Sequence, residues 1–343
     1  MVVKRARATL AQIATAANVS VTTASNVANG RLELMSAATR ERVEAVMRDL
    51  NYRPNEGARS LRLAQRRSIG LIIVDDSPHF LADPMNTNIL AGFSNYLSVN
   101  GFALLLSGIH HAAIDDAHLL RRDQTDALCV IPSGSLAERR RLYRRLKETE
   151  QPILIFQDDR PAFLDDALSV RQNDRGAGER IAARVIGRGA RRLVLLVPAQ
   201  QWPAVTERQL GIDGVVQSAG FDVRFETLVC GSESVADTQT AITRYVDREG
   251  LPDVFIGGND QMGIAALTWA LDRHLAVPAD IRVTGFNGFE FAQYARPRLT
   301  TVTSPAYEMG KRGAALLLKR LSGGRFEERR LVLDVELRPG ESD

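Results

Sequence analysis

A cluster of small hydrogen-bonding side chains near the N-terminus could recognise another molecule. Thr22, Thr23 and Ser25 carry hydroxyl groups that donate or accept, and the amide of Asn26 can pair with adenine through two hydrogen bonds. A helix packed on all sides would bury such groups at a cost of about 1–3 kcal/mol for each one left unpaired. The pattern therefore favours contact with the phosphates and base edges of DNA.

Three short predicted helices would position these side chains. Thr9 and Gln12 have the spacing of a capping box at the start of a first helix. Asn18 suits a left-handed turn, and Ser20 and Ser36 can cap a second and a third helix. Three helices with a tight turn between the first two form a helix-turn-helix. A generic three-helix bundle is the alternative, but it does not explain the polar residues that begin the second helix.

Positive charge is concentrated in the same part of the chain. Residues 1–67 contain twelve Lys or Arg and five Asp or Glu, a net charge of +7, whereas the whole chain carries +3. The remaining residues therefore total −4. A basic segment beside a predicted helix-turn-helix indicates a phosphate backbone as partner, with an affinity that falls as salt rises.

The motifs of this region are similar to the headpiece and hinge of the LacI/GalR family of ligand-responsive bacterial transcriptional regulators. The matching stretches are TLAQIATAANVSVTTASNVANG, SAATRERVEAVMRDLNYRPN, ARSLR and SIGLII. The resemblance and the residue types together imply two sets of DNA contacts, one in the headpiece (Thr9, Ser20, Val21, Thr22, Thr23, Ser25, Asn26 and Asn29) and one in a hinge helix (Ala58, Arg59, Leu61 and Arg62). The family often has Arg or His at the position of Asn26, so we expect an altered base preference at that step.

The hinge segment runs from Pro54 to Arg62. Pro54 suits the first position of a helix, but nine residues are too few to stay helical alone in water. The resemblance implies that two hinge helices pair in the minor groove and that Leu61 wedges between base pairs. The alternative for Leu61 is ordinary packing against the rest of the protein.

Beyond the hinge, short apolar runs alternate with amphipathic stretches, which predicts parallel sheets covered on both faces. The predicted fold is an all-α helix-turn-helix headpiece followed by an α/β core of two parallel-sheet lobes, like periplasmic binding proteins. Its expected domains are the headpiece (1–53), the hinge and linker (54–68) and the core (69–343). The first lobe is expected over 69–160 with 294–324, and the second over 161–293 with 325–343.

Three core stretches also resemble the family: VFIGGNDQMGIAAL, IRVTGFNGFEFA and LTTVTSPAYEMGKRGAALLL. The resemblance implies an effector pocket between the lobes. Its predicted residues are Arg208, Asn259, Asp260, Asn287 and Phe289 from the second lobe, and Asp76, Phe80, Ser107 and Gln157 from the first. Arg208 could instead be a surface residue, Asp260 a helix cap, and the two phenylalanines core residues.

The sequence leaves two types of effector to consider, an anionic one and a neutral one. The family commonly has Asp where Gln157 and Asn287 stand here, and the loss of two carboxylates beside Arg208 makes an anion more acceptable. We therefore expect a sugar acid or a sugar phosphate, with a neutral sugar as the alternative.

Other features bear on cofactors and compartment. His110, His111, Asp115, Asp116 and His118 could suggest a metal, but a solvated loop and helix start is the favoured interpretation, and no metal or cofactor is expected. Cys129 and Cys230 lie in apolar segments typical of buried thiols. No apolar run approaches about 18 residues, and no signal region precedes the headpiece, so we expect a cytoplasmic protein without a membrane span.

The expected assembly is a homodimer on pseudo-palindromic, double-stranded operator DNA, because a two-fold protein reads a two-fold site. No leucine-rich heptads follow Asp334, which disfavours a tail-mediated tetramer. The expected activity is repression controlled by a small-molecule effector. A periplasmic-type sugar-binding protein would leave residues 9–62 unexplained, and an enzyme is not expected, since Ser133, Ser135 and His274 lack a supporting motif such as GxSxG.

Overall fold

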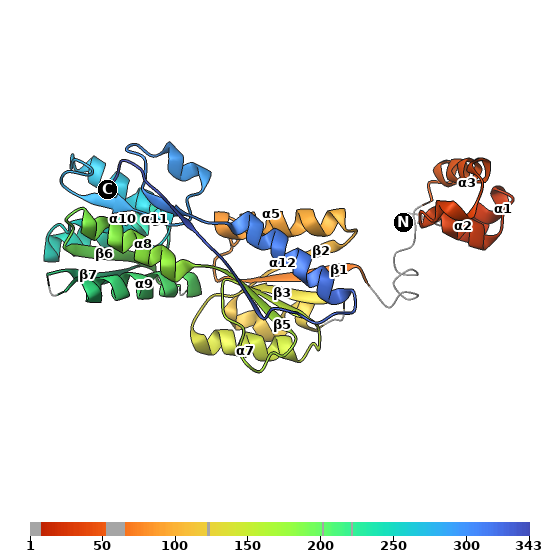
Figure 1. The fold of residues 1–343 in the computed structure, drawn as a ribbon, viewed down its shortest axis with the longest axis horizontal. Helices are drawn as coiled ribbons and strands as arrows, with labels where there is room; N and C mark the ends of the chain where they lie inside the picture. The colour runs from red at the N-terminus through yellow and green to blue at the C-terminus, as the bar shows by residue number, and fades with distance from the viewer. Residues whose placement is uncertain (1–7, 53–65, 122–123, 201, 221) are drawn as a thin grey trace, which may run out of the picture. The chain divides into compact units, whose positions relative to one another are not determined.

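The computed structural model describes residues 8–52, 66–121, 124–200, 202–220 and 222–343. The chain divides into two compact units, Met1–Arg66 and Arg67–Asp343 (Figure 1). This division falls within the linker expected from the sequence, two residues before the predicted start of the core.

The N-terminal unit contains the three expected helices, α1 (Leu10–Ala16), α2 (Val21–Ala28) and α3 (Ala37–Asp49), with a short 3₁₀ helix η1 (Leu32–Leu34) before α3. The backbone N–H of Gln12 donates to the Thr9 hydroxyl at 3.3 Å, and that of Thr9 donates to the Gln12 side chain at 2.8 Å, so the capping box is confirmed. The turn residue Asn18 has φ 51°. A small apolar core holds the helices together: Ile13, Ala14, Ala17, Ala24, Val27 and Val43.

The first lobe of the C-terminal unit contains a six-stranded parallel sheet in the order β11-β5-β4-β3-β1-β2. The strands are β1 (Ser68–Val74), β2 (Ala103–Ile109), β3 (Ala127–Ile131), β4 (Ile153–Phe156), β5 (Ala167–Gln172) and β11 (Arg330–Leu333). Helices α5 (Pro84–Val99) and α12 (Ala306–Leu321) cover one face of the sheet. Segments η2 (His111–Asp116), α6 (His118–Arg121) and α7 (Leu136–Lys147) cover the other.

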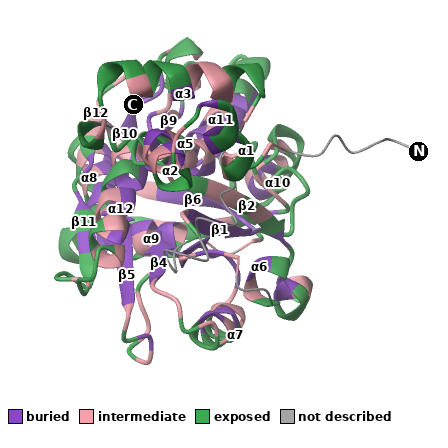
Figure 2. Ribbon diagram, turned by 90° about the vertical axis from the view of Figure 1, so that its right-hand side faces the viewer, coloured by how far each residue is buried: buried purple, intermediate pink, exposed green. Residues whose placement is uncertain are grey.

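The second lobe contains a four-stranded parallel sheet in the order β7-β6-β8-β9. Its strands are β6 (Arg192–Pro198), β7 (Arg224–Cys230), β8 (Val254–Gly257) and β9 (Arg282–Thr284). Helices α8 (Asp174–Gly187) and α9 (Pro203–Ala219) pack on one face, and α10 (Val235–Glu249) and α11 (Asp260–Asp272) on the other. The 3₁₀ helix η3 (Glu290–Tyr294) and an antiparallel pair, β10 (Thr301–Thr303) and β12 (Glu336–Arg338), complete the lobe. Figure 2 shows buried strands between helices whose outer faces are exposed.

The lobe boundaries differ from those expected. β5 pairs with β4, and β11 pairs with β5, so both strands belong to the first sheet rather than to the second lobe. The chain therefore crosses between the lobes near residues 173, 304 and 334, and the lobes comprise about 67–172 with 304–333, and 173–303 with 334–343. All six residues of β5 are buried, which is characteristic of an interior strand of a parallel sheet. This burial is consistent with the position of β5 between β4 and β11.

The three crossing segments are bonded to one another. The hydroxyl of Ser304 donates to the side-chain oxygen of Gln172 at 2.6 Å, and the backbone N–H of Asn173 donates to the carbonyl of Leu333 at 2.9 Å. Lobe movement must therefore bend all three segments together.

Cys129 and Cys230 are both buried and unpaired, as expected. Within the described residues, no helix is long and apolar enough to span a membrane.

Candidate functional site

The outer face of α2 brings most of the predicted headpiece residues together. A hollow on the N-terminal unit is lined by Leu10, Val21, Thr22, Ser25, Asn26, Asn29 and Arg31. Val21 is 51% exposed, although it begins a helix whose opposite side is buried. An exposed apolar residue among hydroxyl and amide groups suits contact with the mixed polar and methyl surface of the major groove.

The predicted headpiece residues differ in whether their side chains already form hydrogen bonds within the protein. Thr9 and Ser20 cap helices, and the hydroxyl of Thr23 lies 2.9 Å from that of Ser20. The Asn29 amide donates to the carbonyl of Ser25 at 2.6 Å. The described part of the chain offers no hydrogen-bond partner to the half-buried side chain of Asn26, which leaves its amide available. The hinge predictions Ala58, Arg59, Leu61 and Arg62 lie outside the described residues.

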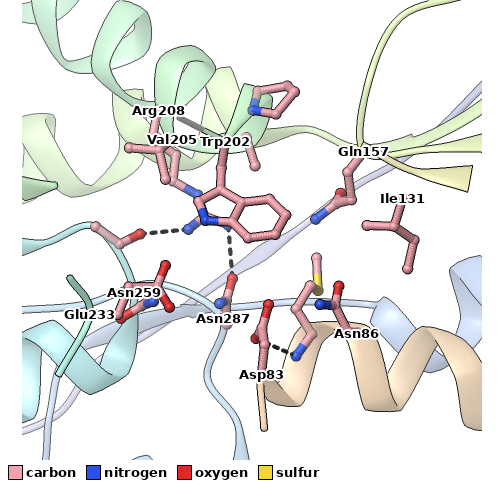
Figure 3. A pocket seen from close by; sticks show the side chains of 14 residues that line it. Asp83, Asn86, Ile131, Gln157, Trp202, Val205, Arg208, Glu233, Asn259 and Asn287 are labelled. Atoms are coloured by element: carbon pink, nitrogen blue, oxygen red, sulfur yellow. Dashed lines mark hydrogen bonds between the residues drawn. The ribbon is translucent and has the colours of Figure 1, made fainter. Parts of the chain in front are cut away.

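In the C-terminal unit, a cavity is lined by side chains from both lobes. It encloses about 470 Å³ of space that no atom fills, part of it open to solvent. The first lobe contributes Asp83, Met85, Asn86, Ile131 and Gln157, and the second contributes Trp202, Pro203, Ala204, Val205, Arg208, Glu233, Gly258, Asn259 and Asn287. Figure 3 shows these side chains, with the indole of Trp202 near the centre of the view. Apolar side chains with a few convergent polar groups are typical of small-molecule sites.

Arg208 is held rigidly at the cavity wall. The side chain is only 3% exposed, so it is not the surface arginine that was the alternative. Its guanidinium donates to Asp174 at 2.9 Å, to the carbonyl of Gly258 at 2.6 Å and to the side-chain oxygen of Asn287 at 2.8 Å, and it lies 4.8 Å from the centre of the Phe286 ring. Burial raises the pKa of Asp174, although the charge of Arg208 opposes this shift. The positive charge of Arg208 is thus already matched by Asp174.

Gln157, Asn259 and Asn287 line the cavity together with Arg208, as the resemblance implies. Gln157 and Asn287 are nine-tenths buried and have positive φ values of 66° and 100°. Asn259 caps α11 by accepting the backbone N–H of Met262 at 3.0 Å. Neutral amides from both lobes therefore face the same space.

Asp260 does not line this cavity. Its carboxylate accepts the hydroxyl of Thr301 at 2.5 Å and the backbone N–H of Phe289 at 3.2 Å. Burial raises the pKa of Asp260 to about 7, against these hydrogen bonds. The residue joins the start of α11 to β10 and to the segment before η3, which is closer to the capping alternative than to effector contact.

Four further predicted residues also lie outside the cavity lining. Asp76 is turned toward His111, whose Nδ1 lies 2.9 Å from the carboxylate. The Phe80 ring packs beside Gly108, and Ser107 lies within edge strand β2. Phe289 packs against the core of the first lobe, as the alternative for the aromatic residues proposed.

Ten of the fourteen cavity residues were not predicted from the sequence, and three of these bring a carboxyl group or an indole: Asp83, Trp202 and Glu233. Asp83 and Trp202 each precede a helix that begins with proline, and Glu233 follows β7. Burial raises the pKa of Asp83 to about 6, and burial together with the charge of Asp83 raises the pKa of Glu233 to about 7. Their position in loops at the sheet ends was the one available signal.

A polar contact joins the lobes beside the cavity. The Gln200 amide, from the second lobe, donates to Asp75 at 3.1 Å and to the Ser133 hydroxyl at 3.2 Å. Ser133 also lies 3.3 Å from Nε2 of His111, but its hydroxyl donates to the carbonyl of Val74 and the residue is 1% exposed. A nucleophile needs access to its substrate, so these contacts are structural. His111 itself is buried, unlike the solvated loop residue expected, and the described residues contain no group of three or more metal-ligating side chains.

Comparisons with known proteins agree with this architecture. Residues 9–55 match the family described as bacterial regulatory proteins, lacI family, and residues 182–342 match the periplasmic binding protein-like domain. The HTH-type transcriptional regulator CelR of Thermobifida fusca is 31% identical over 346 residues, covering 99% of both chains. The HTH-type transcriptional repressor PurR of Vibrio atlanticus is 25% identical, covering 96% of this chain and 97% of that protein.

Solved structures show the same fold. A CelR–cellobiose complex matches with a TM-score of 0.70 and 26% identity, covering 98% of this chain and 100% of that one. A lac repressor dimer bound to operator and an anti-inducer matches with a TM-score of 0.82 at 22% identity, covering 98% and 99%. With a helix-turn-helix unit, a two-lobed core and a relative of this identity along its full length, the chain belongs to the lacI family of bacterial regulatory proteins and is an HTH-type transcriptional regulator.

Proposed function

We propose that this regulator is a repressor that binds a pseudo-palindromic operator as a homodimer and releases or tightens its hold when a sugar-like effector enters the cavity between the lobes. One observation carries the proposal: a cavity is lined from both lobes by polar and apolar side chains, beside three crossing segments that are hydrogen-bonded to one another. A ligand that contacts both lobes can change their relative position. Strand β1, which follows the linker, lies between β2 and β3 in the first sheet, so a lobe movement reaches the headpiece connection.

The lining supports a polyhydroxylated effector. The amide side chains of Asn86, Gln157 and Asn259 can donate to and accept from hydroxyl groups, and the Trp202 ring offers an apolar face. An anionic effector is less favoured than the sequence suggested, because Asp174 already neutralises Arg208, while Asp83 and Glu233 add carboxyl groups. The cellobiose complex of the CelR relative supports a sugar as the ligand type.

The headpiece supports operator recognition through α2. Asn26, with its available amide, is the residue we assign to base discrimination, and Val21, Thr22 and Ser25 contact neighbouring groove atoms. We place the protein in the cytoplasm, where operator DNA is accessible. A periplasmic-type binding protein would account for the core, but not for the N-terminal unit.

Selection of genomic DNA fragments by the purified full-length protein tests this function. We expect a two-fold symmetric consensus, bound well above random duplex at moderate salt. Substitution Asn26→Ala should relax the preference at one base step in each half-site by about 1–3 kcal/mol, roughly 5-fold to 150-fold in relative affinity. The matched control Thr15→Ala, on the exposed side of α1, should leave the consensus unchanged. Equal binding to every duplex would contradict the proposal.

A further inference from the structure

The lining of the cavity between the lobes contains more acidic side chains than basic ones. Asp83 and Glu233 line both this cavity and an adjoining hollow, which Asp75 also lines. Among the described lining residues of the two spaces, Arg208 is the sole Lys or Arg, and its guanidinium lies 2.8 Å from the carboxylate of Asp174. When Asp83 and Glu233 are ionised, their charges have no matching cation in the lining.

An unsatisfied acceptor faces the same cavity. Gln157 lines it, is 8% exposed, and its side-chain oxygen has no hydrogen-bond partner (Figure 3). A buried polar atom without a partner costs about 1–3 kcal/mol, so a ligand that supplies a donor there recovers that free energy. Gln157 follows β4, whereas Asp83 precedes α5 and Glu233 follows β7, so this acceptor comes from a different segment of the chain than either acid.

The cavity also contains an aromatic ring. Trp202 precedes α9 and packs partly against the core of the first lobe while lining the cavity. The face of an indole attracts a cation as well as the apolar face of a sugar ring. Carboxyl groups, an open acceptor and an indole together match a ligand with several donors and a positive charge.

We propose, building on the effector control proposed above, that the preferred ligand is a hydroxylated small molecule with a protonated amine, such as an amino sugar, rather than a neutral sugar or a sugar acid. Glu233 and Asp83 pair with the ammonium group of the ligand. The side-chain oxygen of Gln157 accepts a hydrogen bond from another donor of the ligand, and the Trp202 indole packs against a face of the ligand ring. The described residues offer no cluster of three or more metal-ligating side chains, so an organic cation fits this site better than a metal ion.

The acidic pair gives the site a pH dependence of known sign. Burial raises the pKa of Glu233 to about 7 and that of Asp83 to about 6, with Asp75 raising both and Arg208 lowering both. His79 lines the adjoining hollow. Protonation of the two carboxyls removes their attraction for a cation, so amine binding should weaken as the pH falls from 7.5 to 5.5. The amine itself gains protons over that range, so a loss of affinity reports the carboxyl groups.

Calorimetric titration of the full-length protein with matched probes tests this preference. The pairs are D-glucosamine with D-glucose, and the β-1,4-linked glucosamine dimer with cellobiose; glucuronic acid is the anionic probe. We expect the amine of at least one pair to bind at least tenfold more tightly than its neutral partner at pH 7.5. Glu233→Gln should remove most of that preference, whereas the control Asp272→Asn, at an exposed residue ending α11, should retain it.

Amine probes that bind no better than their neutral partners, or that do not bind, would overturn the preference. A Glu233→Gln variant that prefers the amine as strongly as the native protein does would also overturn it. Thermal denaturation of each variant shows that it is folded. Parallel operator titrations separate the two proposals. A neutral sugar that binds and alters operator affinity would refute the amine while sustaining effector control. Bound probes without any effect on operator affinity would contradict the control itself.

Discussion

At the residue scale, Arg208 lines the cavity and also compensates a buried charge. Its guanidinium is buried, and Asp174, Gly258 and Asn287 accept its hydrogen bonds. Asp174 is 2% exposed and has its own carboxylate fixed by the amide of Gln172 at 2.8 Å. The arginine therefore orients Asn287 in the cavity wall while compensating a buried charge behind it.

Replacing Arg208 should destabilise the core strongly. Arg208→Met leaves the Asp174 carboxylate buried without its cation, and breaking a buried pair in this way costs about 3–5 kcal/mol in free energy of unfolding. The double variant Arg208→Met with Asp174→Asn removes the unpaired charge and should recover a large part of the loss. Urea denaturation of both variants measures the difference. A single variant within about 1 kcal/mol of the native protein would contradict this role.

Family likeness predicted part of the cavity lining. Asn259 and Asn287 lie in matching stretches and line the cavity, as do the predicted residues Gln157 and Arg208, but Asp260 and Phe289 lie in the same stretches and do not. At the end of β1 the sequence analysis chose Asp76, but the contact with the second lobe is made by the adjacent Asp75. Asp75 accepts from Gln200 of the second lobe, whereas Asp76 contacts His111. The direction of a side chain just beyond a strand depends on the loop, and local pattern does not determine it.

At the scale of elements, helix α9 is positioned by close contact with α8. A Cβ atom at Gly178 would lie 2.1 Å from the carbonyl oxygen of Arg208, and one at Gly211 would lie 2.0 Å from that of Arg175. The two helix backbones thus touch at glycines, and this contact determines where α9 presents Arg208 to the cavity.

Substitution Gly178→Ala should separate the two helices. The added methyl group overpacks the contact, which typically costs about 1–3 kcal/mol, and it moves the carbonyl of Arg208. We expect a lower denaturation midpoint and weaker effector binding. Gly214→Ala is the matched control on α9, since nothing lies within 4 Å of its Cβ position, and it should stabilise by up to about 1 kcal/mol through helix propensity. Equal effects of the two substitutions would contradict the contact.

The sequence predicted most elements of the fold but not the path between lobes. Helix caps at Thr9, Ser20 and Ser36 are local signals, and the structure confirms all three. The assignment of β5 and β11 depends on strand pairing over more than 150 residues, as between Ser169 and Arg330. The pattern of apolar residues does not indicate which sheet a buried strand joins, so the lobe boundaries could not be predicted from the sequence.

At the scale of the whole molecule, the sequence concentrates positive charge in the N-terminal part and places the cavity in the core. The headpiece residues of α2 and the cavity residues belong to different compact units. For a ligand in the cavity to control DNA binding by the headpiece, a conformational change in the core must extend to the linker before β1. The crossing segments near residues 173, 304 and 334 are where lobe movement must be accommodated.

The most direct test is the operator affinity of the full-length protein, measured at one salt concentration with and without a ligand that calorimetry shows to be bound in the cavity. The predicted result is a change of about 5-fold to 150-fold, which corresponds to a coupling of about 1–3 kcal/mol between the two sites. Operator affinity that stays the same while the cavity is occupied would contradict the account.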